Sequence, residues 1–285
     1  VNHVNNNSSP YKQIKVDNSL NFLSKCSSIF RENINAKIIS ITGSCGKTTL
    51  KEMIGLTLGK ISKTTYSPES FNNKYGVPLS LFNLKQNDNF GVFEVGMDKK
   101  GEIDDLTNII KPDLGIITNI SYAHSKNFKS IKHIAKAKAE IMNNIKKNGI
   151  IVLNKDDNFY EYHKNFSLKK KLRVISFGIK NKYSITKLVK IKKIKSKYEL
   201  FINVDGKYVS FYSKNSNNSN TYNILATLAA ISLYIDVNNL KKDIFLDIGS
   251  PNGRGNILKV KFKNKKIFLV DESYNLNSLS LNTAI

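Results

Sequence analysis

A seven-residue glycine-rich segment, GSCGKTT at positions 43–49, constrains the fold of this chain more than any other feature. It follows an apolar run, KIISIT at 37–42, and precedes an amphipathic stretch at 50–58. This order predicts a buried strand, a tight glycine turn and a helix. Backbone N–H groups at the start of such a helix, together with Lys47, form a site for the phosphates of a nucleotide, and Thr48 can place its hydroxyl on Mg²⁺.

The loop is shorter than the common P-loop, G-x-x-x-x-G-K-[ST]. Position 41 is Ile41, the first glycine is Gly43, and only two residues separate Gly43 from Gly46. A loop of this length is unusual among GTPases and kinases. It therefore narrows the classes of nucleotide-binding protein that the chain can belong to.

Apolar runs and helical patterns alternate from residue 37 onward. We expect strands at 37–42, 90–95, 114–118, 149–153 and 173–177, and helices at 48–58, 101–110 and 131–146. This alternation predicts an α/β fold with a mostly parallel sheet flanked by helices on both faces.

The regions outside this alternation have patterns of their own. A short helix is expected at 20–30, and two runs that meet at Asp205-Gly206 predict a hairpin. An apolar helix is expected at 222–235, and two strands at 257–262 and 266–271. A Gly-rich turn, GSPNGRG at 249–255, indicates a domain boundary before those two strands.

The composition limits the setting in which the chain works. No run of about 18 apolar residues occurs, and the N-terminal segment lacks the apolar core of a secretory signal, so we expect a cytoplasmic protein without membrane insertion. The net charge of +23 raises the possibility of a polyanionic partner. However, the excess of lysine is spread along the chain, and aromatic residues are not interleaved with it as base stacking requires. Nucleic-acid binding therefore remains an alternative and is not the main expectation.

Two polar residues fall at the ends of neighbouring strands. Glu94 lies at the end of strand 90–95, and His124 follows strand 114–118 in the phrase TNISYAH. Ligands of α/β sheets bind outside the carboxyl ends of the strands. A carboxylate and an imidazole there can ligate one or two Mg²⁺ ions beside a nucleotide. Taken singly, Glu94 can equally be a hydrogen-bonded strand-end residue and His124 a loop residue, but together with the phosphate loop they favour a metal site.

Nine phrases of the chain resemble, in order, the motifs of the Mur ligase family. The resemblance covers roughly residues 15–285, and the short G-x-x-G-K-T loop is the form typical of this family. The phrases are GSCGKTT at 43–49, SFNNKYGVPLS at 70–80, FEVGMDKKGEI at 93–103, ITNISYAHSKNF at 117–128, IAKAKAEI at 134–141, LNKDD at 153–157, YNILATLAA at 222–230, GRG at 253–255 and DESYN at 271–275.

The resemblance implies an ATP-dependent amide ligase that works through an acyl-phosphate intermediate, with ATP and two Mg²⁺ ions as cofactors. The phrases GVPLS and DESYN favour the member that joins D-Ala-D-Ala to UDP-MurNAc-tripeptide in peptidoglycan precursor synthesis. It also implies a monomer with small-molecule substrates. Another Mur ligase, a folylpolyglutamate or cyanophycin-type relative, a basic nucleotide-dependent nucleic-acid binder, and a nucleotide binder without catalysis remain alternatives.

The same resemblance assigns roles to individual residues. The catalytic residues it implies are Lys47, Lys138 and His124, and the implied metal ligands are Thr48, Glu94, His124 and Lys138. The implied ATP-binding residues are Gly43, Ser44, Gly46, Lys47, Thr48, Thr49, Asn223, Arg254, Asp271 and Glu272, and the implied substrate-binding residues are Asn72 and Asn73.

Several of these residues have a plainer interpretation. Lys138 matches the family lysine that reacts with CO₂ to form a carbamate, but from the sequence alone it is a lysine on a helix face. Lys136 lies two residues away and points elsewhere, so if one lysine faces the site we expect the other to be solvated. Asn72 and Asn73 fit an ordinary turn, and Asn223 fits a helix N-terminus.

The resemblance also implies a division into domains. We expect a remnant of an N-terminal UDP-substrate domain at 1–36, a central ATP-binding domain at 37–248, and the start of a truncated C-terminal Rossmann-like domain at 249–285. The chain begins with Val1 and ends inside an apparent helix, so we expect a fragment. Ser219, where the family usually has histidine, and Glu272, where it has a second aspartate, are departures on the adenine and ribose side.

Overall fold

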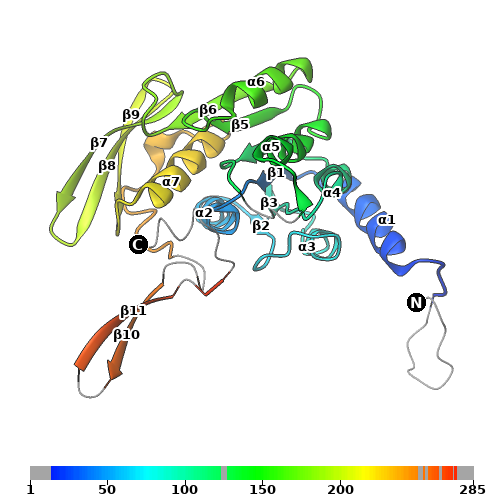
Figure 1. Cartoon of the computed structure of the whole chain (residues 1–285), viewed down its shortest axis with the longest axis horizontal. Helices are drawn as coiled ribbons and strands as arrows, with labels where there is room; N and C mark the ends of the chain where they lie inside the picture. The colour runs from blue at the N-terminus through cyan, green and yellow to red at the C-terminus, as the bar shows by residue number, and fades with distance from the viewer. Residues whose placement is uncertain are drawn as a thin grey trace.

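Nine strands form one sheet in the order β2-β3-β1-β4-β5-β6-β7-β8-β9 (Figure 1). The computed structural model describes residues 14–122, 127–249, 253, 256–262, 265–271 and 273–274. The sheet strands are β1 (Lys37–Thr42), β2 (Thr64–Tyr66), β3 (Phe90–Glu94), β4 (Leu114–Ile117), β5 (Ile150–Asn154), β6 (Arg173–Gly178), β7 (Thr186–Ile194), β8 (Lys197–Val204) and β9 (Lys207–Ser213). Pairing is parallel from β2 to β7 and antiparallel from β7 to β9, which confirms the predicted mostly parallel α/β sheet.

Helices cover both faces of this sheet. They are α1 (Ser19–Glu32), α2 (Lys47–Gly59), α3 (Gly76–Leu81), α4 (Glu102–Ile110), α5 (Ile131–Ala139), α6 (Tyr160–Lys169) and α7 (Asn218–Ile231), with 3₁₀ turns η2 (Glu140–Asn143) and η3 (Val237–Asn239). The helices expected at 20–30, 48–58 and 101–110 are present as α1, α2 and α4.

Two apolar cores lie on opposite faces of the sheet because side chains alternate along each strand. On β1, Ile39 and Ile41 point to the core that α2 and α7 complete. Ile38 points to the other core, which is completed by residues of α3, α4, α5 and α6. Strands buried on both faces read as continuous apolar runs, which is why the parallel strands could be predicted from the sequence.

The central strands bring three chain segments to one edge of the sheet. β1 lies between β3 and β4, with Ile41 opposite Glu94 and Thr42 opposite Ile117. All three strands run in the same direction, so the glycine-rich loop, Glu94 and the segment after Ile117 lie at the same carboxyl edge. After β1 the chain forms β2 and β3 on one side of β1, and it then crosses to form β4 on the other side. The point where the strand order reverses in this way is where α/β sheets bind ligands.

Two helix boundaries differ from the sequence-based expectation. The helix expected at 131–146 ends at Ala139 and continues as the turn η2, although Met142 and Ile145 are still buried and prolong the apolar pattern. The helix expected at 222–235 begins earlier, at Asn218, because the Asn217 side chain accepts a hydrogen bond from the Asn220 amide and caps it. It ends at Ile231.

The two strands expected at 257–262 and 266–271 are present, and they pair as a separate hairpin. β10 (Asn256–Phe262) pairs with β11 (Lys265–Asp271) in antiparallel register, and Figure 1 shows this hairpin projecting away from the nine-stranded sheet. The hairpin expected at Asp205-Gly206 is likewise present between β8 and β9. The proposed domain boundaries near 36 and 249 stay predictions.

Helix α1 is tied to the sheet domain by a buried arginine. Arg31 is 3% exposed, its Nε donates to the carbonyl of Ile110, and one Nη donates to the carbonyl of Ile34. Its guanidinium also lies 3.8 Å from Asp113, a carboxylate that accepts a hydrogen bond from the amide of Ile38 at the start of β1.

Through the described ranges of the chain, no helix has the length and apolar character needed to cross a membrane.

Candidate active site

The glycine-rich loop turns sharply between β1 and α2. Gly46 has φ = +80° and precedes the first turn of α2, a backbone conformation that favours glycine. Gly43, at φ = +150°, has no room for a side chain, because a Cβ there would lie 1.8 Å from Oγ1 of Thr118. Gly43 is therefore required for the close passage of the loop against the end of β4, and Gly46 for the turn into α2.

The segment after β4 holds the loop through a set of hydrogen bonds. Oγ1 of Thr118 donates to the carbonyl of Cys45 at 2.7 Å, and the Cys45 amide donates to Oδ1 of Asn119 at 3.1 Å. The Ser44 amide donates to the carbonyl of Asn119, and the Ser44 hydroxyl donates to the carbonyl of Ser121. These bonds fix the start of α2, whose free N–H groups and dipole favour an anion.

Four polar side chains meet beside the loop at the end of β3. Oγ1 of Thr48 donates to Oε2 of Glu94 at 2.7 Å, and Nδ2 of Asn72 donates to Oε1 of the same carboxylate at 2.6 Å. Glu94 is 1% exposed, and Oγ of Ser70 lies 3.2 Å from Oγ1 of Thr48. The predicted pair Thr48 and Glu94 is thus brought together, and hydroxyl and carboxylate oxygens are the donors that Mg²⁺ prefers.

Lys138 on α5 lies on the other side of the loop. Its ammonium donates to the carbonyl of Gly43 at 2.9 Å and is 2% exposed, whereas Lys136 is exposed, as the two-residue spacing predicts. Lys138 is therefore buried against the loop, whereas Lys136 is the solvated one of the two lysines.

The electrostatic surroundings of Lys138 favour the neutral amine. Burial, and then the positive charge of Lys47, hold the pKa of the Lys138 ammonium well below its ordinary value, against a smaller opposing effect of Glu94. Lys47 also donates to the carbonyl of Gly43, at 3.1 Å, so both lysines converge on one atom of the loop. The ammonium of Lys47 and the buried amine of Lys138 thus lie together at a site suited to an anionic group.

The two adjacent asparagines of the SFNN phrase have different surroundings. Asn72 faces the site and contacts Glu94, as described above. Oδ1 of Asn73 instead accepts the amides of Tyr75 and Gly76 and begins α3, which is the turn interpretation. Asn73 is exposed, and its predicted substrate contact stays a prediction.

Asn223 lies against the loop rather than at a helix end. Helix α7 is capped by Asn217, and Asn223 lies a full turn inside the helix. Its Oδ1 is 3.3 Å from the position that a Cβ on Gly46 would occupy, and the side chain is buried. The helix-terminus interpretation of Asn223 is therefore wrong, while its predicted role toward a nucleotide stays a prediction.

Four of the residues singled out from the sequence are not placed at this site. His124, Arg254 and Glu272 lie outside the described residues. Asp271 ends β11 on the projecting hairpin, and its Oδ1 accepts the amide of Ser273. The roles expected of these four residues stay predictions.

The structure adds residues that sequence patterns did not single out. Thr118 and Asn119 stand in the phrase ITNISYAH, and Ser70 stands in SFNN, so each lay within a recognised phrase without a role of its own. Lys51 is a fourth addition, a fully buried lysine on α2. Its signal is a charged residue among Leu50, Met53 and Ile54, at a position where the helix faces the core.

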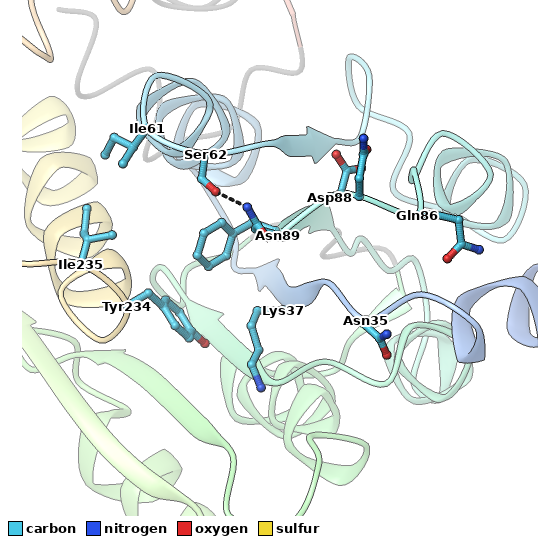
Figure 2. Close-up of a pocket in the computed structure, with 11 residues that line it drawn as sticks. Asn35, Lys37, Ile61, Ser62, Gln86, Asp88, Asn89, Tyr234 and Ile235 are labelled. Atoms are coloured by element: carbon cyan, nitrogen blue, oxygen red, sulfur yellow. Dashed lines mark hydrogen bonds between the residues drawn. The ribbon is translucent and has the colours of Figure 1, made fainter.

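A pocket of about 580 Å³ lies elsewhere, at the amino ends of the strands (Figure 2). Lys37 and Phe90, which begin β1 and β3, line it together with Asn89 and Tyr234, and the Asn89 side chain donates to the hydroxyl of Ser62. β1 and β3 run from this pocket toward the glycine-rich loop, so the pocket and the loop occupy opposite edges of the sheet. Because ligands of such sheets bind at the carboxyl edge, we assign no part of the nucleotide chemistry to this pocket.

Comparison with known protein families agrees with this geometry. The model of the Mur ligase middle domain matches residues 41–231, which include the loop, Glu94, Lys138 and Asn223. The chain belongs to the Mur ligase family. The resemblance expected from the nine phrases is thereby confirmed.

Individual Mur ligases resemble the chain over nearly all of its length. The UDP-N-acetylmuramoyl-tripeptide–D-alanyl-D-alanine ligases of Buchnera aphidicola subsp. Baizongia pistaciae and of Rickettsia prowazekii are each 33% identical to it over 96% of this chain. A crystal structure of MurF from Acinetobacter baumannii superposes with a TM-score of 0.86 at 25% identity, covering 95% of this chain and 58% of that one. The chain spans 58% and 60% of the length of the two curated Mur ligases.

Proposed function

We propose that this chain carries the ATP-binding and catalytic part of a ligase that joins D-Ala-D-Ala to UDP-MurNAc-tripeptide. The strongest support is that Thr48, Glu94 and Asn72 contact one another beside the glycine-rich loop. Lys47 and Lys138 both bond to the Gly43 carbonyl of the same loop. We infer the two substrates from the names of the curated Mur ligases that are 33% identical to this chain.

The reaction we propose has two steps. A carboxylate oxygen of the tripeptide attacks the γ-phosphorus of ATP, ADP leaves, and an acyl phosphate forms. The amine of D-Ala-D-Ala then attacks the acyl carbon, phosphate leaves with the oxygen that had joined it to carbon, and the amine loses a proton. Both steps need the charge around the γ-phosphate neutralised and the carboxylate held in line.

The loop residues are proposed to hold the phosphates. The backbone of Gly43, Ser44, Gly46, Lys47, Thr48 and Thr49 surrounds the start of α2, where N–H groups favour anions. Lys47 would place its ammonium on the β- and γ-phosphates in place of the Gly43 carbonyl. Asn223, buried against Gly46, would approach the nucleotide from α7.

Thr48 and Glu94 are proposed to hold the first Mg²⁺, since their oxygens are already 2.7 Å apart and buried. When bound, the metal supplies positive charge to the transferring phosphoryl group. Asn72 would fix the rotamer of Glu94 by its hydrogen bond to the other carboxylate oxygen. His124 is proposed as a ligand of a second Mg²⁺.

Lys138 is proposed to act as its carbamate. Only a neutral amine adds to CO₂, and it releases one proton as the N–C bond forms, so a lysine with a lowered pKa is the right reactant. The product is an anion close to the ammonium of Lys47, which bonds to the same carbonyl of Gly43 as Lys138. It would serve as, or orient, a ligand of the second Mg²⁺.

We further infer a cytoplasmic monomer with no nucleic-acid partner. The basic residues are spread along the chain, and β7 carries only four of its lysines, of which Lys190, Lys192 and Lys193 are exposed. The remaining predicted contacts, Arg254 to the phosphates and Asp271 and Glu272 to the ribose, belong to the same proposal.

The experiment that tests this function is phosphate release by the protein expressed from its full gene. ATP, Mg²⁺ and UDP-MurNAc-tripeptide are supplied, and the amine is varied. We expect turnover with D-Ala-D-Ala and none with D-Glu or a diamino acid. Equal turnover with all amines, or none with any, would contradict the assignment.

A further inference from the structure

Lys51 is a buried cation that the proposed mechanism does not use. It lies on α2 one turn beyond Lys47 and Thr48, and its side chain is fully buried. A buried charge persists in a fold only where hydrogen bonds and opposite charge compensate its lost hydration. The hydrogen-bond partners of Lys51 therefore indicate the role of this residue.

The ammonium of Lys51 meets as many acceptors as it has N–H bonds. Nζ donates to the carbonyls of Ser67 and Glu69, each at 2.8 Å, and to Oε1 of Glu52 at 3.4 Å. The ring of Tyr66 lies 5.6 Å from the same nitrogen. Two of these acceptors are backbone atoms of one loop, so the lysine joins α2 to that loop.

The joined segment runs from Ser67 to Asn73, between β2 and α3, and we call it the 67–73 loop. Within it, Ser70 contacts Thr48, and Asn72 donates to Glu94. Its backbone is strained at Glu69, a non-glycine residue at φ = +41° whose carbonyl is one of the two that Lys51 holds. The loop therefore needs an external partner at the residue just before Ser70.

We propose that Lys51 is a positioning residue, which pins the 67–73 loop to α2 so that Ser70 and Asn72 meet Thr48 and Glu94. The inference rests on the proposed function for its catalytic meaning and on the contacts themselves for its structural meaning. α2 begins at the phosphate loop, so one helix carries Thr48 and also holds the loop whose Asn72 bonds to Glu94, the partner of Thr48. An apolar side chain could fill the same space but would leave two loop carbonyls without their donor.

The test compares Lys51→Met with a matched control, Lys60→Met. Lys60 lies at the end of the same helix, where its ammonium donates to the carbonyl of Ile244, far along α2 from Thr48. In the enzyme expressed from its full gene, we expect Lys51→Met to lower kcat/KM for ATP by about 10-fold to 100-fold, the usual cost of losing a group that orients a metal ligand. The KM for D-Ala-D-Ala should change by less than about twofold, as should every parameter of Lys60→Met.

Amide hydrogen exchange tests the same point without relying on activity. The Phe71 amide bonds within the 67–73 loop, and those of Tyr75 and Gly76 bond to Asn73. In Lys51→Met we expect peptides spanning 67–76 to exchange about tenfold faster or more, while those spanning 37–42 keep the wild-type rate, because the opening is local.

The outcomes separate the two proposals. Unchanged exchange across 67–76 in a folded Lys51→Met protein would overturn the role of Lys51, and so would equally faster exchange in every peptide, which is the mark of general destabilisation. If the wild-type enzyme shows no ligase turnover, the proposed function fails, yet the exchange result still decides whether Lys51 pins the loop.

Discussion

Lys138 and Lys136 lie on the same helix but have different surroundings. On the sequence it stands two residues from Lys136, with the same neighbours on either side. In the fold, Lys136 is exposed, whereas Lys138 is buried close to Lys47. Burial, and then the charge of Lys47, lowers the pKa of Lys138. Residue identity alone could not reveal this, because the difference arises from the direction in which α5 faces the phosphate loop.

Replacing Lys138 by alanine should abolish ligase activity, because the proposed carbamate would lose its nitrogen. A short carboxylate such as acetate or formate should restore part of the activity by entering the vacated space as an anion. Phosphate release at increasing acetate concentration measures this rescue. A fully active Lys138→Ala enzyme would show that the carbamate assignment is wrong.

Gly43 offers a second test at the scale of one residue. A methyl group there would lie 1.8 Å from Oγ1 of Thr118, so either the loop or the end of β4 must shift. Overpacking of this kind costs about 1–3 kcal/mol of folding free energy. We expect Gly43→Ala to weaken Mg-ATP binding more than tenfold, about 1.4 kcal/mol, measured by calorimetry.

The control for Gly43→Ala is Gly59→Ala, at the end of the helix that follows the loop. No atom lies within 4 Å of a Cβ at Gly59, and alanine there should be neutral or slightly stabilising. Equal nucleotide affinity in Gly43→Ala and Gly59→Ala would mean that the close passage of the loop under β4 does not matter for binding.

At the scale of elements, a histidine links the helix of Lys138 to its neighbour. Nε2 of His163 on α6 lies 3.0 Å from the carbonyl of Ala135 on α5, and because a carbonyl only accepts, this nitrogen carries the proton. The side chain is 2% exposed. Burial lowers the pKa of His163 to about 4, although the bond to Ala135 opposes the shift.

This pKa predicts how stability changes with pH. Between pH 6.5 and about 4 the unfolded chain binds a proton at His163 that the folded chain excludes, so folding weakens as the pH falls through this range. The full loss is up to about 3 kcal/mol, from about 1.4 kcal/mol per pKa unit. Urea unfolding at several pH values should show a shallower dependence in His163→Gln, which keeps an N–H donor but does not titrate.

Exposed His133 on α5 supplies the matched control for His163. The variant His133→Gln should keep the wild-type dependence of unfolding free energy on pH. If His163→Gln loses as much stability as the wild type between pH 6.5 and 4, the group responsible lies elsewhere.

The elements differ in how far the sequence could predict them. The parallel strands are apolar throughout and were predictable, whereas β2 has only three residues, α3 contains Pro78 in its first turns, and α6 is too polar to show a clear apolar face. At the site, the loop and the ends of β3 and β4 follow from strand order. The contacts of Lys51 with the 67–73 loop are tertiary, and no local pattern encodes them.

For the whole molecule, the arrangement supports transfer to a carboxylate over hydrolysis of ATP by water. Three strand ends bring the phosphate loop, Glu94 and the Thr118 segment to one edge of the sheet, with Lys138 closing the loop from α5. In the proposed function, this buried site would hold the γ-phosphate and an anionic acceptor in line. The short glycine loop, which departs from the common P-loop, lies at the centre of this site, where its carbonyls bond to Lys47, Lys138 and Thr118.

Transfer of isotopic oxygen tests this central claim most directly. UDP-MurNAc-tripeptide labelled with ¹⁸O in its terminal carboxylate is incubated with the enzyme, ATP, Mg²⁺ and D-Ala-D-Ala, and the released phosphate is analysed by mass spectrometry. Attack of the carboxylate on the γ-phosphorus predicts one ¹⁸O atom in each phosphate released. Unlabelled phosphate, with the label retained in the peptide, would contradict the account.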